Sequence, residues 1–234
     1  MEYKIALVYT GMPVKLVGMV EQALTKRFEG DKLTFLTLSD PSIIADAVKN
    51  GSPSKQAVSR LVGLYAQALH MGADAILNVC SSVGDVACAA QGLCRMAGVP
   101  LVRIDEKMAE EAVGRHTKIG VIATLSSTME PTKRLLRACA EKAGKQIELY
   151  CALADNAFGG GAAPLIEAAK KLDQAECIVL AQGSMGDSRE EVEKASGKPT
   201  FASPYWGALG VSYGKKVTEN DRKVTDNKFR SLFF

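Results

Sequence analysis

The chain alternates between short apolar runs and longer segments in which apolar residues recur every three or four positions. Short apolar runs predict buried strands, and the three-to-four spacing predicts amphipathic helices. The predicted strands cover residues 3–10, 33–38, 75–79, 101–104, 117–124, 147–152 and 177–181. The predicted helices cover residues 14–28, 43–50, 54–71, 86–96, 106–113, 131–143, 162–172 and 204–213. Strands that alternate with helices in this way favour parallel sheets covered by helices.

Two segments of the chain occur twice, which indicates that the fold contains two copies of one unit. The sequence DAILNVCSSVGD at 74–85 returns at 176–187 as ECIVLAQGSMGD, so that Cys80 of the first copy corresponds to Gln182 of the second. The first strand likewise resembles the strand at 117–124, so that Thr10 corresponds to Thr124.

We therefore expect an α/β fold with two pseudo-symmetric, Rossmann-like domains, each built on a parallel sheet. The first domain is expected to comprise residues 1–100 and 205–234, and the second residues 101–204. In open α/β sheets, ligands bind beyond the carboxyl ends of the strands. An interdomain active-site cleft would then be lined by the strand-end loops, which are residues 10–13, 80–84, 124–128 and 182–185.

Cys80 has the most distinctive chemistry in these loops. It ends an apolar strand just before a predicted helix, and a helix N-terminus lowers the pKa of a thiol. We therefore expect Cys80 to be reactive and the other five cysteines to be packing residues. Ser81 and Ser82 could cap the next helix, bind a substrate carboxylate through their backbone N–H groups, or do both. Asp85 and Asp187 are expected to cap helices rather than to transfer protons.

Composition and charge narrow the class of protein. With 234 residues, 47% hydrophobic and 24% charged, the chain has the profile of a soluble globular protein. The net charge of +3 is small, and the basic residues are scattered apart from those at 215–228, which argues against nucleic-acid binding. No apolar run approaches the ~18 residues of a membrane span, and no cysteine or histidine spacing predicts a metal site. The unpaired cysteine pattern and a first segment that predicts a strand rather than a signal peptide favour a cytoplasmic protein.

Three segments carry a family resemblance: 74–85 with its cysteine, 119–128 (IGVIATLSST) and 178–187 (IVLAQGSMGD). From Lys4 to about Tyr213 the chain resembles the aspartate/glutamate/hydantoin racemase superfamily, and the third segment is most similar to the hydantoin racemases. The resemblance implies two pseudo-symmetric α/β domains with the active site between them, no metal, no organic cofactor, and a homodimer or larger homo-oligomer. It also implies that two cysteines flank the substrate α-carbon, one accepting a proton and the other returning one, and that Cys80 is the first.

The chain departs from this pattern at Gln182, which stands where the hydantoin racemases have their second cysteine. Because an amide does not titrate in water, a symmetric two-thiol racemase is not expected. Cys80 could act as an acid or base on one face of the substrate, or add to a substrate carbon as a nucleophile. Gln182 could then hold a carboxylate or a developing enolate through its NH₂ group. The expected substrate-binding residues are Thr10, Asn78, Ser81, Ser82, Thr124, Ser127, Thr128, Gly183 and Ser184.

These expectations favour a cofactor-independent isomerase or epimerase that acts on a small carboxylate or hydantoin-like substrate through a single cysteine. Two alternatives stay open. One is a lyase such as a decarboxylase, which protonates a planar intermediate from one face. The other is a two-lobed small-molecule binding protein without activity, although binding alone does not require the Cys80 thiol. The glycines within 156–161 are expected to form a mobile loop, and the role of residues 215–234 is left open.

Overall fold

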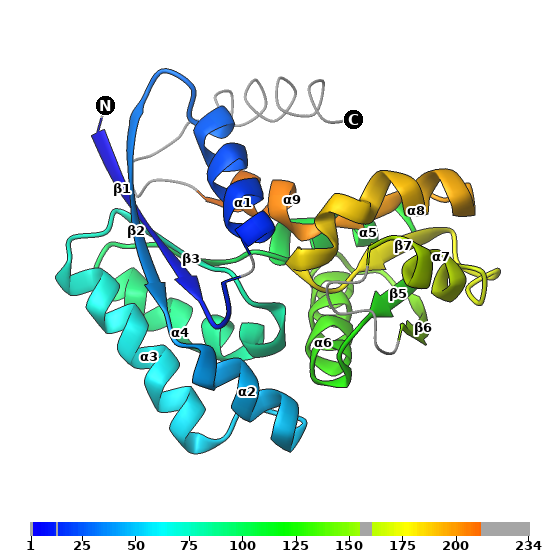
Figure 1. Ribbon diagram of the computed structural model, residues 1–234, viewed down its shortest axis with the longest axis horizontal. Coiled ribbons are helices and arrows are strands. Elements are labelled where there is room, and N and C mark those ends of the chain that lie inside the picture. Colours follow the sequence, from blue (N-terminus) through cyan, green and yellow to red (C-terminus); the bar gives the residue numbers. More distant parts are fainter. Residues whose placement is uncertain (1, 13, 155–160, 212–234) are drawn as a thin grey trace.

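Two parallel β-sheets of four strands each organise the chain, one in each half of the molecule (Figure 1). The computed structural model describes residues 2–12, 14–154 and 161–211. Most of the glycine-containing loop expected at 156–161 and the whole of segment 215–234 therefore lie outside the described residues. Helices pack on both faces of each sheet, which confirms the predicted α/β class.

The first sheet has the strand order β2-β1-β3-β4. It contains β1 (Glu2–Tyr9), β2 (Lys32–Ser39), β3 (Ala75–Asn78) and β4 (Leu101–Arg103). All neighbouring strands are parallel, and every residue of β3 is buried. Continuous apolar runs of this kind are typical of parallel strands, because helices cover both faces of the sheet.

The second sheet repeats this arrangement in the order β6-β5-β7-β8. It contains β5 (Lys118–Ala123), β6 (Glu148–Leu153), β7 (Cys177–Leu180) and β8 (Thr200–Ala202). β5 and β7 occupy the places of β1 and β3, so the two halves are pseudo-symmetric, as the sequence repeat predicts. The sequence analysis missed β8 and the preceding helix, α8 (Arg189–Ser196). β8 has only three residues, and most of α8 is polar or charged, so neither gives a clear apolar pattern.

The other helices lie between consecutive strands in the chain, apart from the last helix, which follows β8. They are α1 (Val14–Arg27), α2 (Pro41–Asn50), α3 (Lys55–His70), α4 (Gly84–Met96), α5 (Glu106–Arg115), α6 (Ser126–Lys142), α7 (Ala163–Ala169) and α9 (Ser203–Gly210). Two 3₁₀ segments, η1 (Ser81–Val83) and η2 (Gly183–Ser188), precede α4 and α8. The side chains of Asp40 and Ser54 cap α2 and α3 by accepting backbone N–H groups at 3.0 and 3.3 Å.

α6 begins five residues earlier than the sequence predicts. We expected the helix to start at Pro131, but Pro131 lies inside it. A proline lacks the N–H that would bond to the carbonyl four residues earlier, so its place near the N-terminal end costs the helix one hydrogen bond. The additional turn carries Thr128, whose hydroxyl hydrogen-bonds to Ser82 of the other half of the molecule.

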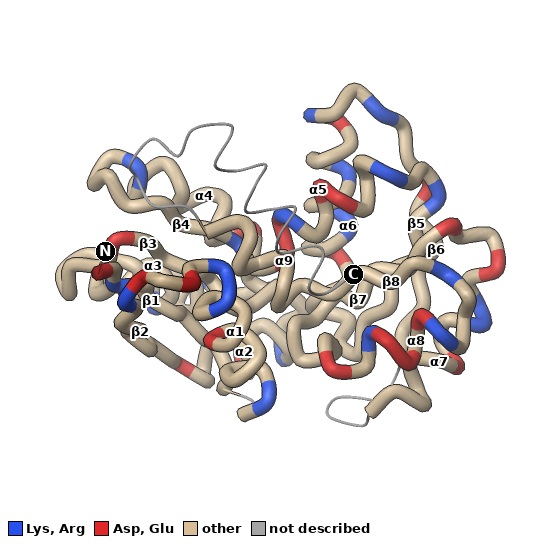
Figure 2. Tube along the Cα trace, turned by 90° about the horizontal axis from the view of Figure 1, so that it is seen from above, with Lys and Arg blue, Asp and Glu red and all other residues tan. Residues whose placement is uncertain are grey.

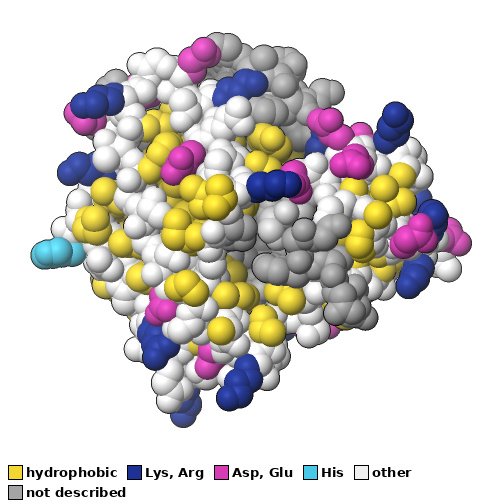
Figure 3. Space-filling view, viewed as in Figure 1, with side chains coloured by type: hydrophobic (Ala, Val, Ile, Leu, Met, Phe, Trp, Pro, Cys, Tyr) yellow, Lys and Arg dark blue, Asp and Glu magenta, His cyan; other side chains and the backbone are white. Residues whose placement is uncertain are grey.

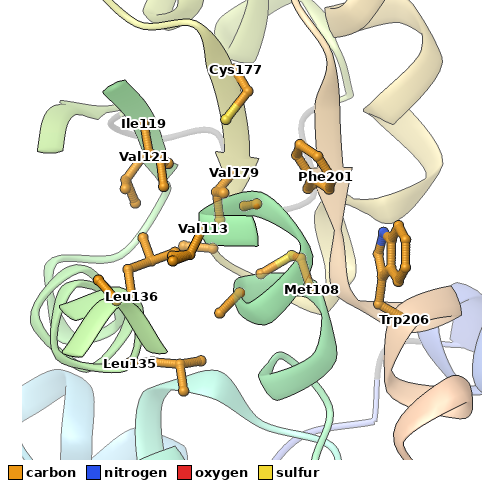
Figure 4. Packing of buried hydrophobic residues seen from close by; sticks show 14 of the residues in the cluster. Met108, Val113, Ile119, Val121, Leu135, Leu136, Cys177, Val179, Phe201 and Trp206 are labelled. Carbon is orange, nitrogen blue, oxygen red and sulfur yellow. The ribbon is translucent and has the colours of Figure 1, made fainter. Parts of the chain in front are cut away.

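Apolar side chains fill both faces of each sheet. Alternate residues of a strand point to opposite faces, so Ile5 and Leu7 of β1 pack toward α1, whereas Ala6 and Val8 pack toward α2, α3 and α4. In the second half, residues of α5, α6, β5 and β7 pack together with Phe201 of β8 (Figure 4). The two sheets therefore have separate cores.

α9 joins these cores. Its Trp206 packs in the second core, with 6.1 Å between its ring centroid and that of Phe201 (Figure 4), whereas Ala208 packs in the first core. β4 pairs with β3 and thus belongs to the first sheet, although the expected boundary placed residues from 101 onward in the second domain. The division into 1–100 with 205–234 and 101–204 stays a prediction, and sheet membership moves its first boundary beyond Arg103.

Charged residues of both signs are distributed along the chain in both halves (Figure 2). On the face shown in Figure 3, most of the charged side chains lie toward the outline of the molecule. Groups of apolar side chains lie between them. Within the described ranges, no helix combines the length and the apolarity needed to cross a membrane. In the same ranges, no three side chains of the types that bind metals cluster together.

Gly84 begins α4 at a position where no side chain fits. Arg103 is 1% exposed, and a β-carbon on residue 84 would overlap its guanidinium group. The guanidinium cannot move aside freely, because it donates to both carboxylate oxygens of Asp105, at 2.9 and 3.1 Å. Gly92 in the same helix has no heavy atom within 4 Å of an added β-carbon.

We predict that Gly84→Ala lowers the free energy of unfolding by about 1–3 kcal/mol, the usual effect of overpacking. Gly92→Ala is the matched control, and we expect it to raise the free energy of unfolding by about 0.5–1 kcal/mol because alanine favours helix interiors. Urea unfolding of the two variants measures both changes. Equal effects would show that the Arg103 guanidinium does not restrict position 84.

Candidate active site

A cavity lies between the two halves at the carboxyl ends of the strands, where the sequence analysis expected a ligand. Of the predicted site residues, its wall contains Thr10, Cys80, Ser81 and Ser82 from the first half and Gln182, Gly183 and Ser184 from the second. The structure does not bring Asn78, Thr124, Ser127 or Thr128 to this wall, although Asn78, Thr124 and Thr128 hydrogen-bond to residues in it. The predicted loops thus meet at one place.

The register of the first sheet places Cys80 beside Thr10. Val8 of β1 pairs with Asn78 of β3. Thr10 and Cys80 each lie two positions further along the chain, so they leave the neighbouring strands at the same level. The Thr10 side chain hydrogen-bonds to the Cys80 thiol, and backbone N–H groups of η1 do so as well. The thiol therefore has a fixed place at the strand end.

Gln182 has the equivalent position in the second half. Ile122 of β5 pairs with Leu180 of β7, which gives Thr124 and Gln182 the same relation as Thr10 and Cys80. The Gln182 Oε1 atom accepts the Thr124 backbone N–H at 2.9 Å, and its Nε2 atom donates to Thr124 Oγ1 at 2.7 Å. These bonds fix the amide in one orientation, and the second hydrogen of Nε2 is left for a ligand.

Asn78 supports the turn that carries Cys80 instead of reaching the cavity. It is fully buried in β3. Its Oδ1 atom accepts the Tyr65 hydroxyl at 2.9 Å, and its Nδ2 atom donates to the Cys80 carbonyl oxygen at 2.9 Å. Both ends of the amide thus bind protein groups, which makes Asn78 a positioning residue for Cys80.

The expectation of a lowered pKa for Cys80 is wrong. Burial of the thiol raises its pKa, and the charge of Asp105 adds to this effect. The hydrogen bonds from Thr10 and from η1 favour the thiolate but do not outweigh the burial. The sequence analysis considered the helix start and not the desolvation of the sulfur, which disfavours the charged form. Cys80 is consequently a protonated thiol at neutral pH in this conformation.

Hydroxyl groups near Cys80 divide into those with partners and those without. The Ser82 and Thr128 hydroxyls hydrogen-bond to each other at 2.7 Å and so connect η1 of the first half to α6 of the second. Ser81 is 4% exposed, and its hydroxyl has no hydrogen-bond partner among the described residues. Because buried polar groups are normally paired, the Ser81 hydroxyl at the cavity wall is available for a ligand. The buried Ser127 hydroxyl is also without a partner in the described residues, but it does not line the cavity.

A buried ion-pair network behind η1 was missed by the sequence analysis. The Arg103 and Asp105 side chains are each about 1% exposed and form two hydrogen bonds. The Arg103 Nη1 atom also lies 3.4 Å from Asp85 Oδ1. By strand pairing, the counterpart of Arg103 in β8 is Ala202, so the internal repeat gave no signal for this arginine.

Asp85 and Asp187 form ion pairs between the two halves and are not the N-caps of α4 and α8. Asp85 Oδ2 lies 2.6 Å from Arg134 Nη2 of α6, and Asp187 Oδ2 lies 3.1 Å from Lys15 Nζ of α1. The two aspartates are equivalent in the repeat, and α1 and α6 follow the equivalent strands β1 and β5. The interface thus has two pseudo-symmetric bridges. Each is partly exposed and contributes only ~0.2–1 kcal/mol.

We predict that Arg134→Met increases the rate at which iodoacetamide alkylates Cys80, because losing one bridge favours separation of the halves around the partly buried thiol. The expected increase is about two- to fivefold, which corresponds to up to ~1 kcal/mol. Arg137→Met removes the same charge from the same helix and is the control. Mass spectrometry of the alkylated site measures the rates, and equal rates in both variants would contradict a role for the bridge in closure.

The fold is shared with several solved racemases and isomerases. A glutamate racemase from Francisella tularensis in complex with D-glutamate is 12% identical, with a TM-score of 0.65 over 97% of this chain and 82% of that one. An allantoin racemase from Klebsiella pneumoniae is 13% identical, with a TM-score of 0.59 over 98% and 88%. A maleate isomerase from Pseudomonas putida is 13% identical, with a TM-score of 0.59 over 89% and 91%. At these identities the likeness establishes the fold.

Sequence comparison gives the family. None of the curated proteins matches the chain significantly in sequence. The family model of the Asp/Glu/hydantoin racemases matches residues 14–204, which include both strand-end turns at the cavity. The chain therefore belongs to the Asp/Glu/hydantoin racemase family.

Proposed function

We propose that this chain is a cofactor-independent isomerase that acts on a small carboxylate or hydantoin-like substrate through Cys80 alone. One observation carries the proposal: among the described residues of the cavity wall, only Cys80 has a side chain that titrates. Gln182 lines the same cavity from the other half but cannot exchange a proton. Membership of a racemase family supports chemistry at a carbon next to a carbonyl group.

The proposed step transfers one proton from carbon to sulfur and back. The Cys80 thiolate takes the proton from the carbon beside the substrate carbonyl, and the C–H electron pair becomes the enolate. The neutral thiol exchanges its proton with solvent and returns a proton to the same carbon. Return to the original face restores the substrate, whereas return after the planar enolate has turned over gives the isomer, so no oxidant or second acid is needed. The Ser81 hydroxyl and the remaining N–H of Gln182 supply hydrogen bonds that stabilise the enolate oxygen.

A substrate panel read by NMR in D₂O tests this proposal. The panel comprises amino acids, hydantoins, and maleate-like and malonate-like acids. We expect one class to exchange its C–H for deuterium with the native protein and not with Cys80→Ser. Cys151→Ser changes an exposed cysteine and is the control that keeps the exchange. Exchange that survives in Cys80→Ser would exclude Cys80 as the reacting group.

A lyase that protonates a planar intermediate is the second candidate, and the raised pKa of Cys80 favours it. A protonated thiol is ready to donate to the carbanion that decarboxylation leaves, and this reaction needs an acid on one face only. In the same panel, a lyase would release CO₂ from a substituted malonate and place one deuterium on the product. An isomerase would leave the carbon skeleton unchanged.

The pH profile separates the two candidates. Because burial raises the pKa of Cys80, the thiolate is scarce at neutral pH and increases as the pH rises. We predict that kcat/KM for C–H exchange rises with pH. An ordinary thiol ionises near pH 8.5, and the rise is expected to continue above that pH. A lyase that uses the protonated thiol would instead lose activity over the same range. A profile for exchange that is flat from pH 7 to 10, in an assay free of protein unfolding, would contradict thiolate chemistry.

We predict that Gln182→Cys gains two-face racemisation of a hydantoin or amino acid. The new thiol would stand beside Thr124 as Cys80 stands beside Thr10, so each face would have one titratable group. Affinity is expected to fall, because the variant loses the amide N–H that is proposed to bind the substrate. Chiral chromatography compares the native protein, Gln182→Cys, and Gln182→Cys with Cys80→Ser. Equal racemisation by the native protein and Gln182→Cys would show that another group already serves the second face.

A further inference from the structure

The cavity wall combines polar groups from the strand ends with apolar side chains from neighbouring helices. Its larger apolar residues are Leu16, Ile44, Val79 and Leu125. Leu16 and Ile44 come from α1 and α2 of the first half, and Leu125 precedes α6 in the second. A ligand at Cys80 is therefore close to apolar side chains from both halves.

Glycines bring two of these apolar side chains close to the reactive turns. Ile44 Cγ2 lies 3.6 Å from the place of a β-carbon on Gly11, the residue after Thr10. Leu16 Cδ1 lies 3.0 Å from the place of a β-carbon on Gly183, the residue after Gln182. The Leu16 distance is tighter than an ordinary contact, so Leu16 occupies space that a side chain at position 183 would need, whereas the Ile44 distance is an ordinary van der Waals contact. The apolar part of the wall lies immediately beside the groups proposed to hold the reacting atoms.

Positive charge is absent from the described part of this wall, which contains no lysine, arginine or histidine. Two cations near it have carboxylate partners elsewhere: Lys15 pairs with Asp187, and Arg103 pairs with Asp105. A charged group on the substrate's substituent would have to enter the apolar part of the wall without a counter-charge. Burying a charge in this way is strongly unfavourable.

We infer that Leu16 and Ile44 determine specificity, and that they restrict the site to substrates with an apolar, uncharged substituent on the reacting carbon. The polar part of the substrate has partners in the Ser81 hydroxyl and the Gln182 amide, whereas its substituent packs against the two aliphatic side chains. This inference rests on the proposed function, since it concerns the same site, but it can be tested by binding alone.

Two hydantoins of the same size and shape form the first test. 5-Isobutylhydantoin and 5-carboxymethylhydantoin carry substituents with the same number of heavy atoms, but only the second substituent is charged. Calorimetry with the native protein is expected to show at least ~10-fold tighter binding of the isobutyl compound, as for an uncompensated charge beside an apolar wall. This comparison requires no variant and does not depend on folding of an altered chain.

A charge added to the wall is the second test. Ile44→Lys supplies a cation beside the substituent and is expected to shift the affinity ratio toward the carboxymethyl compound by ~10-fold or more. Val48 lies one turn further along α2, at an exposed position outside the cavity wall. Val48→Lys is therefore the matched control, because it adds the same charge to the same helix. We expect Val48→Lys to leave the ratio unchanged.

The outcomes separate this inference from the proposed function. Preferential binding of the isobutyl compound without Cys80-dependent exchange would support the specificity and reject the isomerase. Equal binding, tighter binding of the carboxymethyl compound, or no binding of the isobutyl compound at millimolar concentration would overturn the inference. It would also be overturned if Val48→Lys shifted the ratio as much as Ile44→Lys.

Discussion

The contact between a threonine and the residue two positions beyond the end of the neighbouring strand determines the geometry of both halves of the site. Thr10 hydrogen-bonds to Cys80 in the first half, and Thr124 holds Gln182 in the second. Both contacts follow from the parallel register of the strands, so the repeat in the sequence becomes a repeat in the cavity. The two halves therefore differ less in geometry than in chemistry, since one offers a thiol and the other an amide.

Contacts between the two halves determine the chemical environment of the thiol and the amide. The hydroxyl contact between Ser82 and Thr128 and the bridge from Asp85 to Arg134 hold η1 and α4 against α6. The buried environment that results raises the pKa of Cys80 and strengthens every hydrogen bond that a ligand makes there. A thiol that rests in its protonated form, opposite an amide that never titrates, is suited to proton transfer on one face of a substrate.

The sequence predicted the parallel sheets, the two-fold repeat and the meeting of Cys80 and Gln182 at one cavity, because apolar periodicity and repeated motifs are local signals. It did not predict what depends on contacts between distant segments. The pKa of Cys80 follows from desolvation by the assembled fold, and Arg103 has no counterpart in the repeat that could mark it. Asn78 lay within a recognised motif, yet its amide is occupied by Tyr65 and the Cys80 carbonyl, a pairing that only the fold reveals.

The position of deuterium in a chiral substrate tests the one-thiol account most directly. One enantiomer of the substrate is incubated with the native protein in D₂O, and both enantiomers are separated and analysed at early times. Because a single group removes and returns the proton, the account predicts that deuterium enters the starting enantiomer before the inverted enantiomer accumulates. If deuterium appeared only in the inverted enantiomer, protons would be exchanged on both faces, and the central role of Cys80 as the one titrating group would be contradicted.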